Sequence, residues 1–264
     1  MEFADGKILA DITDGVGRIT FNQPEKRNAM SVTMWAGMAE ALDLFEKDAA
    51  VRCVVLTGAG DKAFVSGADI SQFDKLRSDA DAQREYSRQT AGGRLRLATF
   101  PKPVIAEIRG FCMGGGLGIA MSCDIRIAAE GSQFGIPAAK LGIAYGFDMV
   151  RQLVDLVGPA NAHMILMTGE RFPAEEALRF GLINKLVPAE ALAGEVAALT
   201  ATIARNAPLS LYANKRTVQA VLQDRADRDI AALNAGMAAC FDSEDYKEGR
   251  RAFLEKRKPA FAGR

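Results

Sequence analysis

The feature that most constrains this chain is a run of three glycines, Gly114, Gly115 and Gly116, set between two apolar segments. Residues 104–108 before the run predict a buried strand, and residues 117–121 after it predict a helix. Glycine is needed where the backbone takes positive φ or where a ligand approaches the main chain. A helix that begins at such a turn leaves N–H groups without intrahelical partners, which favours an anion or oxyanion site. The alternative is a tight turn that packs the helix against the sheet.

A nucleotide-binding loop is disfavoured by the residues around the glycines. No lysine followed by serine or threonine comes after them, as a phosphate-binding P-loop requires. The dinucleotide-binding pattern, in which an acidic residue follows the glycines by about 20 positions, is not matched cleanly either. The turn therefore does not predict a nucleotide cofactor.

The composition excludes several classes of partner. The 33 basic and 33 acidic residues of the 264-residue chain balance, so no overall field attracts nucleic acid or an anionic membrane. The four cysteines form no CxxC pair, which favours free buried thiols over a zinc site or a disulfide framework. No apolar run reaches the roughly 18 residues of a membrane span, and the first residues do not form a signal peptide. We therefore expect a cytoplasmic protein with no nucleic-acid partner, no membrane partner and no metal.

Strand and helix patterns alternate along most of the chain. Residues 16–21, 51–57 and 124–129 predict strands, and residues 32–48 predict a helix. From residue 189 onward the pattern is almost wholly helical. This order predicts an α/β fold of stacked helix and sheet layers, followed by a helical C-terminal region. That region holds more apolar positions than a self-contained helix pair needs, which predicts burial against a partner.

Short motifs occur in a fixed order along nearly the full length of the chain. They are PEKRNA at 24–29, AFVSGADI at 63–70, the glycine turn, FGIP at 134–137 and FLEKRKP at 253–259. In these motifs the chain resembles the crotonase, or enoyl-CoA hydratase/isomerase, superfamily. So many ordered matches are very specific for the fold and much less specific for the reaction.

The resemblance implies an α/β fold, a crotonase-type spiral of ββα units with a C-terminal α-helical trimerisation region. It divides the chain into a spiral core, residues 1–205, and a helical oligomerisation region, residues 206–264. It also implies a homotrimer or a dimer of trimers that acts on an acyl-CoA thioester. Coenzyme A enters as part of the substrate, so no permanently bound cofactor is expected.

The resemblance also gives the glycine turn a role in the reaction. It implies that the backbone N–H groups of Ala68 and Gly115 form an oxyanion hole for the thioester oxygen. An enolate needs preorganised donors where its charge develops, and removing one such donor typically costs about 3 kcal/mol of barrier. Both donors belong to the main chain, so side-chain substitutions test them poorly.

Contacts to the substrate are implied at further positions. The implied contacts to the CoA nucleotide and phosphates are Lys26 and Arg27 and, from a neighbouring subunit, Phe253 and Lys256. The remaining substrate-binding residues implied by the resemblance are Asp69, Ile70 and Gly114. For each basic residue, a solvated surface charge is the alternative.

Two positions depart from the hydratases of this family. Those hydratases carry one glutamate three residues after the middle glycine of the turn, where this chain has Gly118. They carry another directly after the proline of the FGxP segment, where this chain has Ala138. Neither residue can exchange a proton, so hydration by two carboxylates lacks both its acid and its base. We therefore do not expect an efficient hydratase.

The polar residues nearest this region in sequence are Tyr145 and Asp148, and we predict that they carry the catalytic side-chain chemistry of the pocket. Tyr145 is similar to a tyrosine of methylmalonyl-CoA decarboxylase, whereas relatives with other chemistry place an acidic residue at the helix start that here holds Asp148. The alternatives are a wall residue for Tyr145 and a helix-start residue stabilised by the dipole for Asp148. Glu107 is an acidic residue within an apolar strand. We predict that it forms an ion pair with Arg109 or Arg126, and the alternative is a role in the pocket.

Three functions remain open from the sequence. The first is a lyase or isomerase reaction on an acyl-CoA, with decarboxylation of a malonyl-type thioester foremost, because loss of CO₂ forms the enolate without a general base. The second is weak enoyl-CoA hydration or isomerisation by substitute acids. The third is a non-catalytic CoA-binding protein. Residues 74–97 are polar and largely helical, which predicts a mobile lid over the pocket.

Overall fold

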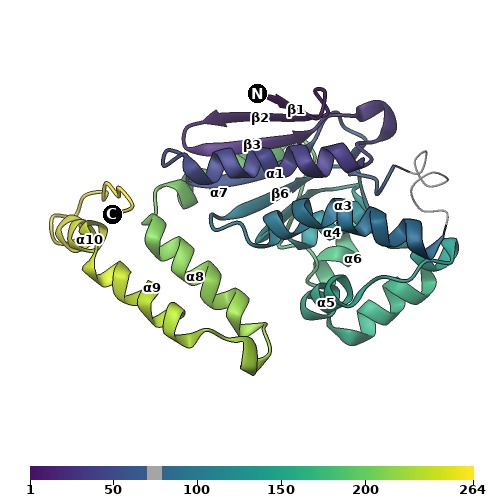
Figure 1. Ribbon diagram of the computed structural model, residues 1–264. Helices are drawn as coiled ribbons and strands as arrows, with labels where there is room; N and C mark the ends of the chain where they lie inside the picture. Colours follow the sequence, from purple (N-terminus) through teal and green to yellow (C-terminus); the bar gives the residue numbers. More distant parts are fainter. Residues whose placement is uncertain (70–78) are drawn as a thin grey trace.

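The computed structural model describes residues 1–69 and 79–264 and shows helices packed around two sheets (Figure 1). Within these residues, the larger sheet has the strand order β1-β2-β3-β4-β6-β8-β11, and the smaller sheet has the order β10-β9-β7-β5. The larger sheet consists of β1 (Glu2–Phe3), β2 (Ile8–Thr13), β3 (Val16–Phe21), β4 (Cys53–Gly58), β6 (Val104–Ile108), β8 (Ile125–Ala129) and β11 (Lys185–Val187). The smaller sheet consists of β5 (Ala63–Val65), β7 (Phe111–Met113), β9 (Gln133–Gly135) and β10 (Arg171–Pro173).

The chain visits the two sheets in turn, which gives the spiral that the resemblance implied. β4 is followed by β5, β6 by β7 and β8 by β9, so each pair contributes one strand to each sheet. Strands from successive pairs run parallel, with Leu56 opposite Ala106 in the larger sheet and Cys112 opposite Phe134 in the smaller one. A helix follows each pair of strands. The α/β class and the ββα unit are therefore confirmed.

Local sequence signals set the limits of the helices. Helix α1 begins after Ser31, whose hydroxyl accepts a hydrogen bond from the Met34 N–H at 3.3 Å. Helix α5 breaks at Gly158, directly before Pro159. The helices are α1 (Val32–Lys47), α3 (Ala80–Ala98), α4 (Gly115–Met121), α5 (Phe147–Thr168), α6 (Ala174–Arg179), α7 (Leu192–Ala204), α8 (Pro208–Val221), α9 (Ile230–Asp242) and α10 (Glu244–Leu254), with short 3₁₀ turns η1 (Pro24–Lys26), η3 (Pro137–Leu141) and η4 (Arg225–Asp227). Across the described ranges, no helix combines the length and apolar character that a membrane span needs.

The central strands of the larger sheet are buried on both faces. On one face, Leu56 and Ala106 belong to the core cluster that includes Met38 of α1. On the other face, Val55 and Ile105 belong to a second cluster with residues of α7. Burial on both faces explains why these strands have nearly continuous apolar sequences.

Glu107 interrupts one of these strands and lies on the same face as Ile105, as the alternation of side chains predicts. Its carboxylate forms an ion pair with Arg18 of β3 at 2.8 Å. The prediction of an ion pair is confirmed, but the predicted partners were wrong. Arg109 and Arg126 donate instead to backbone carbonyl oxygens. The parallel register of β3, β4 and β6 brings Arg18 to this face, and the sequence alone does not fix that register.

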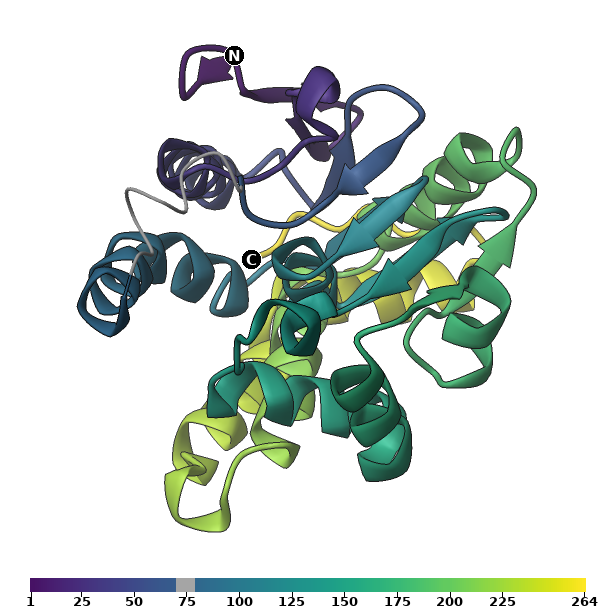
Figure 2. The same cartoon turned by 90° about the vertical axis from the view of Figure 1, so that its right-hand side faces the viewer.

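Helices α8 to α10 at the C-terminal end project from the body of the molecule (Figure 1, Figure 2). The Lys215 ammonium of α8 ties them to the core by donating to the Asp124 carboxylate at 2.7 Å and to the Lys102 carbonyl oxygen at 2.9 Å. Large apolar side chains remain exposed along these helices, namely Val218, Val221, Leu222, Ile230, Met237 and Phe241. The division of the chain after residue 205 and the oligomerisation of residues 206–264 remain predictions.

Candidate active site

Two turns meet at one edge of the smaller sheet. The first follows β5 and contains Ala68, and the second follows β7 and leads into α4 at Gly115. Because β5 and β7 are neighbouring parallel strands, their carboxyl ends lie at the same edge. A Cβ atom built on Gly115 would lie 3.9 Å from the Ala68 nitrogen. The fold therefore places these two main-chain segments next to each other.

The backbone around Ala68 turns its N–H away from the neighbouring strand. Met30 forms a parallel bridge with Ala68, in which its N–H donates to the Gly67 carbonyl oxygen at 2.8 Å and its carbonyl oxygen accepts from the Asp69 N–H at 3.0 Å. In a parallel bridge the residue between these two bonds directs its own N–H to the opposite side. No hydrogen bond joins the Ala68 N–H to any residue in the described ranges.

The second donor comes from the start of α4. Gly114 has φ 52° and ψ −116°, a conformation that residues with a Cβ atom rarely adopt. Gly116 is needed for a different reason, which is space. A Cβ atom there would lie 2.1 Å from the Val65 carbonyl oxygen. The first N–H of a helix has no intrahelical acceptor, and that of Gly115 has no hydrogen bond to a described residue. We call the Ala68 and Gly115 N–H groups and their turns the donor wall.

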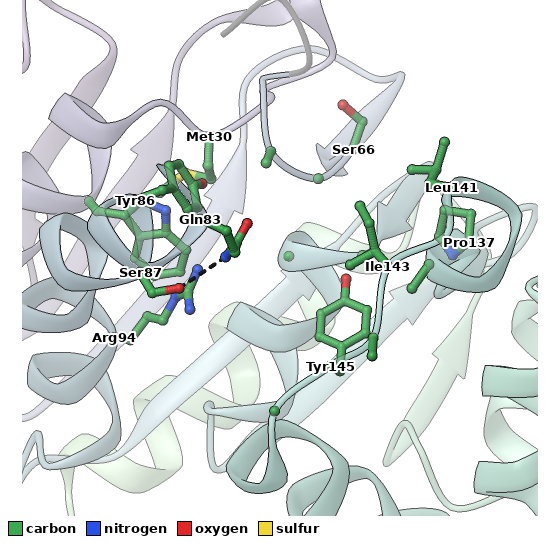
Figure 3. Close-up of a pocket in the computed structure, with 18 residues that line it drawn as sticks. Met30, Ser66, Gln83, Tyr86, Ser87, Arg94, Pro137, Leu141, Ile143 and Tyr145 are labelled. Atoms are coloured by element: carbon green, nitrogen blue, oxygen red, sulfur yellow. Dashed lines mark hydrogen bonds between the residues drawn. The ribbon is translucent and has the colours of Figure 1, made fainter. Parts of the chain in front are cut away.

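A cavity of about 280 Å³ opens beside the donor wall (Figure 3). Its lining includes Gly67, Ala68, Gly114 and Gly115 at the two turns. An apolar side of the cavity is formed by residues at and after η3, namely Pro137, Ala138, Leu141, Ile143 and Ala144. None of the described lining residues is an aspartate or a glutamate. The cavity therefore offers backbone donors without a carboxylate base from this part of the chain.

Tyr145 brings a polar group to this apolar side. It lies in the loop before α5, and a Cβ atom built on Gly114 would lie 3.4 Å from its hydroxyl oxygen. Figure 3 shows its ring directed into the cavity beside Ile143. The phenol hydroxyl both donates and accepts hydrogen bonds, so it suits a carboxylate or a carbonyl oxygen held at this position.

Asp148 does not line this cavity with Tyr145, although the sequence predicted that the two residues carry its polar side-chain chemistry. Its exposed side chain lies in the first turn of α5 and lines a second cavity, of about 1120 Å³, together with Arg151 and residues of α8. Tyr145 precedes α5, whereas Asp148 lies in its first turn, and the two side chains line different cavities. The correction favours a helix-start role for Asp148.

The two positions where the family's hydratases carry glutamate differ in their surroundings. Ala138 lines the cavity. Gly118 does not line it, because the thioether of Met149 covers this part of α4. A Cβ atom on Gly118 would lie 3.2 Å from the Met149 Cε atom. An apolar side chain therefore fills the space beside Gly118.

The predicted CoA contacts are spread over several parts of the molecule. The Lys26 ammonium pairs with the buried Asp69 carboxylate at 2.8 Å, next to the donor wall. The Arg27 guanidinium lies 5.2 Å from the centre of the Phe111 ring. Phe253, at the end of α10, is 84% exposed, and Lys256 follows it in the chain. Ile70, together with Asp74 of the predicted lid, lies outside the described residues.

Side chains of α3 form the wall opposite the loop that carries Tyr145, and the sequence did not single them out. The Gln83 amide donates to the Ser87 hydroxyl at 3.0 Å, and the Arg94 guanidinium lies 5.2 Å from the Trp35 ring centre. We call Gln83, Tyr86, Ser87 and Arg94 the α3 wall. They lie three, four and eleven positions after Gln83, a spacing that places them on one helix face, and this was the available signal. The predicted lid therefore corresponds in part to a wall of the cavity.

Two buried thiols flank the glycine turn in sequence. Cys112 precedes the glycine turn in β7, and Cys123 follows α4. Burial raises the pKa of Cys123 to about 12 and the pKa of Cys112 well above its ordinary value. Both thiols therefore stay protonated at neutral pH and are poor nucleophiles.

Comparison with known proteins identifies the relatives of the chain. The family model described as enoyl-CoA hydratase/isomerase matches residues 11–264. The chain is 37% identical to a short-chain-enoyl-CoA hydratase of Clostridium acetobutylicum, over 95% of each protein, and 36% identical to a crotonyl-CoA hydratase of Syntrophomonas wolfei, over 96% of this chain and 97% of that protein. It matches the crystal structure of an enoyl-CoA hydratase/carnithine racemase from Magnetospirillum magneticum with a TM-score of 0.91 and 35% identity, over 98% of this chain and 96% of that one. The chain therefore belongs to the enoyl-CoA hydratase/isomerase family.

Proposed function

We propose that the protein binds an acyl-CoA thioester and holds the thioester oxygen, as an enolate, between the N–H groups of Ala68 and Gly115. The observation that carries this proposal is the donor wall itself. Two main-chain N–H groups from separate turns lie side by side at a cavity, without partners among the described residues. Donors fixed before the reaction stabilise developing charge without reorganisation, which is the usual main source of such catalysis.

Decarboxylation of a malonyl-type thioester is the reaction that needs least from the rest of the cavity. The bond between Cα and the carboxylate breaks, its electron pair forms the enolate, and CO₂ leaves. A proton then adds to Cα, so no general base is required. Tyr145 is the residue we assign to orient the departing carboxylate through its hydroxyl. The apolar side of the cavity solvates a carboxylate poorly, which favours its loss.

Hydration of an enoyl-CoA is the second candidate, and the names of the two hydratase relatives favour it. Hydration requires groups that position a water molecule and move a proton. Ala138 in the described lining and Gly118, which Met149 covers, supply none. Double-bond isomerisation requires proton transfer as well. We therefore rank both below decarboxylation.

A panel of CoA thioesters separates these reactions. Malonyl-type, enoyl and saturated acyl-CoA are each assayed for CO₂ release, water addition and double-bond shift. We expect CO₂ release to dominate and crotonyl-CoA hydration to lie far below an ordinary turnover of about 10 s⁻¹. Hydration at that ordinary rate would contradict the ranking. Equal calorimetric affinities for acyl-CoA and free CoA would contradict the oxyanion hole, and with it an acyl-CoA enzyme.

Binding of the CoA portion is part of the same proposal. Lys26 pairs with Asp69 next to the donor wall, Arg27 lies over Phe111 at the start of β7, and both supply positive charge for the phosphates. Phe253 and Lys256 contribute from a neighbouring subunit in a homotrimer or a dimer of trimers. The exposed apolar side chains of α8 and α9 support such an assembly. Light scattering tests it, and a monomer at micromolar concentration would remove the contribution of these two residues.

A further inference from the structure

Arg94 differs from the other arginines of α3. Arg84 pairs with Asp81, Arg88 with Glu85, and Arg96 with Asp43 and Glu46. No carboxylate within residues 1–69 and 79–264 pairs with Arg94. Its guanidinium instead lies 5.2 Å from the ring centre of Trp35, and both side chains line the cavity.

The stacking on Trp35 holds the guanidinium in a defined position. A guanidinium that lies over an aromatic face is attracted by the ring, and its N–H donors remain available at its edges. Those donors match the two oxygens of a carboxylate in a bidentate arrangement. Trp35 itself is buried, so the platform under Arg94 is rigid.

The described lining of the cavity therefore carries positive charge and no negative charge. Arg94 is the charged side chain among the described lining residues, and no aspartate or glutamate in that lining neutralises it. The hydroxyl of Ser87 and the amide of Gln83 line the same wall and are hydrogen-bonded to each other. A cation with polar neighbours at the side of an otherwise apolar pocket favours an anionic group on the ligand.

The position of Arg94 in the cavity indicates which part of the ligand would carry the anionic group. Figure 3 shows Arg94 and Ser66 at opposite sides of the cavity, with Tyr145 on the wall across from α3. Ser66 belongs to the turn that carries the Ala68 donor. A group that contacts Arg94 therefore lies on the side of the cavity opposite the turn that carries Ala68.

We propose that the acyl group carries a carboxylate at the end remote from the thioester, and that this carboxylate pairs with Arg94. This inference rests on the proposed function, because it needs the thioester at the donor wall. If the reaction is a decarboxylation, the acyl group carries a second carboxylate on Cα; that one leaves as CO₂, and the remote carboxylate stays on the product. Arg94 is thus a specificity-determining residue.

Calorimetric binding of matched saturated thioesters tests the inference. Adipyl-CoA and hexanoyl-CoA have acyl chains of the same length and differ in the terminal carboxylate, and glutaryl-CoA and pentanoyl-CoA form a shorter pair. We expect the charged member of at least one pair to bind about tenfold more tightly, since a charged hydrogen-bonded pair at an exposed arginine is weakened by solvent. Arg94→Gln should remove this preference and leave the uncharged thioesters and free CoA unchanged.

Arg88→Gln is the matched control, because it removes the same charge from the same helix at an exposed position that does not line the cavity. It should keep the preference. Equal binding within both pairs by the unmodified protein would overturn the inference, even if both thioesters bind more tightly than CoA. If Arg94→Gln lowered the affinity for charged thioester, uncharged thioester and free CoA equally, Arg94 would contact the CoA portion. That result would also overturn the inference. Failure of every thioester to bind more tightly than CoA would instead contradict the proposed function.

Discussion

The two walls of the cavity are built from different parts of the chain. The donor wall consists of main-chain N–H groups that two turns of the smaller sheet bring together. The α3 wall consists of side chains on one face of a helix. Folding alone fixes the donor wall, and any chain with the same turns would have it. The α3 wall depends on which side chains the helix carries.

This difference suggests a division of labour between reaction and recognition. The donor wall serves any thioester, because it contacts the atoms that all acyl-CoA molecules share. The α3 wall lies away from those atoms and contacts the part of the acyl group that differs between substrates. Changes in the donor wall should therefore affect folding and turnover, whereas changes in the α3 wall should affect affinity and choice of substrate.

The largest effect is expected for Gly116→Ala, which disturbs the donor wall directly. The added Cβ would lie 2.1 Å from the Val65 carbonyl oxygen, and this main-chain atom cannot move without shifting β5. We expect a loss of about 3 kcal/mol or more in the free energy of unfolding, at the upper end for overpacked sites. Urea unfolding measures the loss.

Gly118→Ala in the same helix is the control for Gly116→Ala. Its Cβ would meet only the flexible end of Met149, at 3.2 Å. Replacing glycine by alanine inside a helix stabilises by about 0.5–1 kcal/mol where space permits. Equal unfolding free energies for the two variants would show that the close contact with Val65 does not hold the donor wall in place.

The next largest effect is expected for Tyr145→Phe, which removes the one polar side-chain atom that we assign to the reaction. We expect kcat/KM for the best substrate of the thioester panel to fall by roughly 10²-fold, as for other positioned polar groups. Asp148→Asn should cost under about 1 kcal/mol, because its side chain lines the other cavity. A loss under about 1 kcal/mol for Tyr145→Phe would leave catalysis to the backbone donors alone.

The glycine turn of the donor wall was predictable from local sequence rules, the pairing of Ala68 with Gly115 was implied by the family resemblance, and the α3 wall was not predicted. The glycines limit the backbone to few conformations, so strand, turn and helix followed from local rules. The choice of Arg94 over Arg88 or Arg96 depends on which face of α3 meets Trp35, and tertiary packing decides that. The same reason explains why Glu107 pairs with Arg18, which is 89 residues away in the chain.

The separation of Tyr145 from Asp148 has a similar cause. The two residues are three positions apart in sequence and were predicted to supply the polar chemistry of one pocket, but α5 begins between them at Phe147. The motif indicated the correct region of the chain. The direction of each side chain depends on where the helix begins, and helix limits are the least certain part of a prediction from sequence.

Alkaline pH should weaken the fold through the buried thiols that flank the glycine turn in sequence. Burial raises the pKa of Cys123 from 9.0 to about 12, so the folded state keeps its proton in a range where the unfolded chain has lost it. Stability from this thiol is full below pH 9 and falls between pH 9 and 12, by up to about 1.4 kcal/mol per pH unit. Urea unfolding at several pH values measures the slope. Cys123→Ala should reduce it, and an unchanged slope would contradict the assignment.

The smallest effect is expected for Ser87→Ala, and it tests whether the α3 wall acts on binding alone. The change removes the hydroxyl that accepts a hydrogen bond from the Gln83 amide at 3.0 Å. Loss of one partly buried hydrogen bond between neutral groups is worth about 1 kcal/mol, so KM for the best thioester should change by no more than about fivefold. The donor wall and Tyr145 are untouched, and we therefore expect kcat to stay the same. Steady-state kinetics separates the two parameters when chemistry is slower than substrate release. A tenfold fall in kcat at unchanged KM would show that the α3 wall takes part in the reaction and would remove the distinction between the two walls.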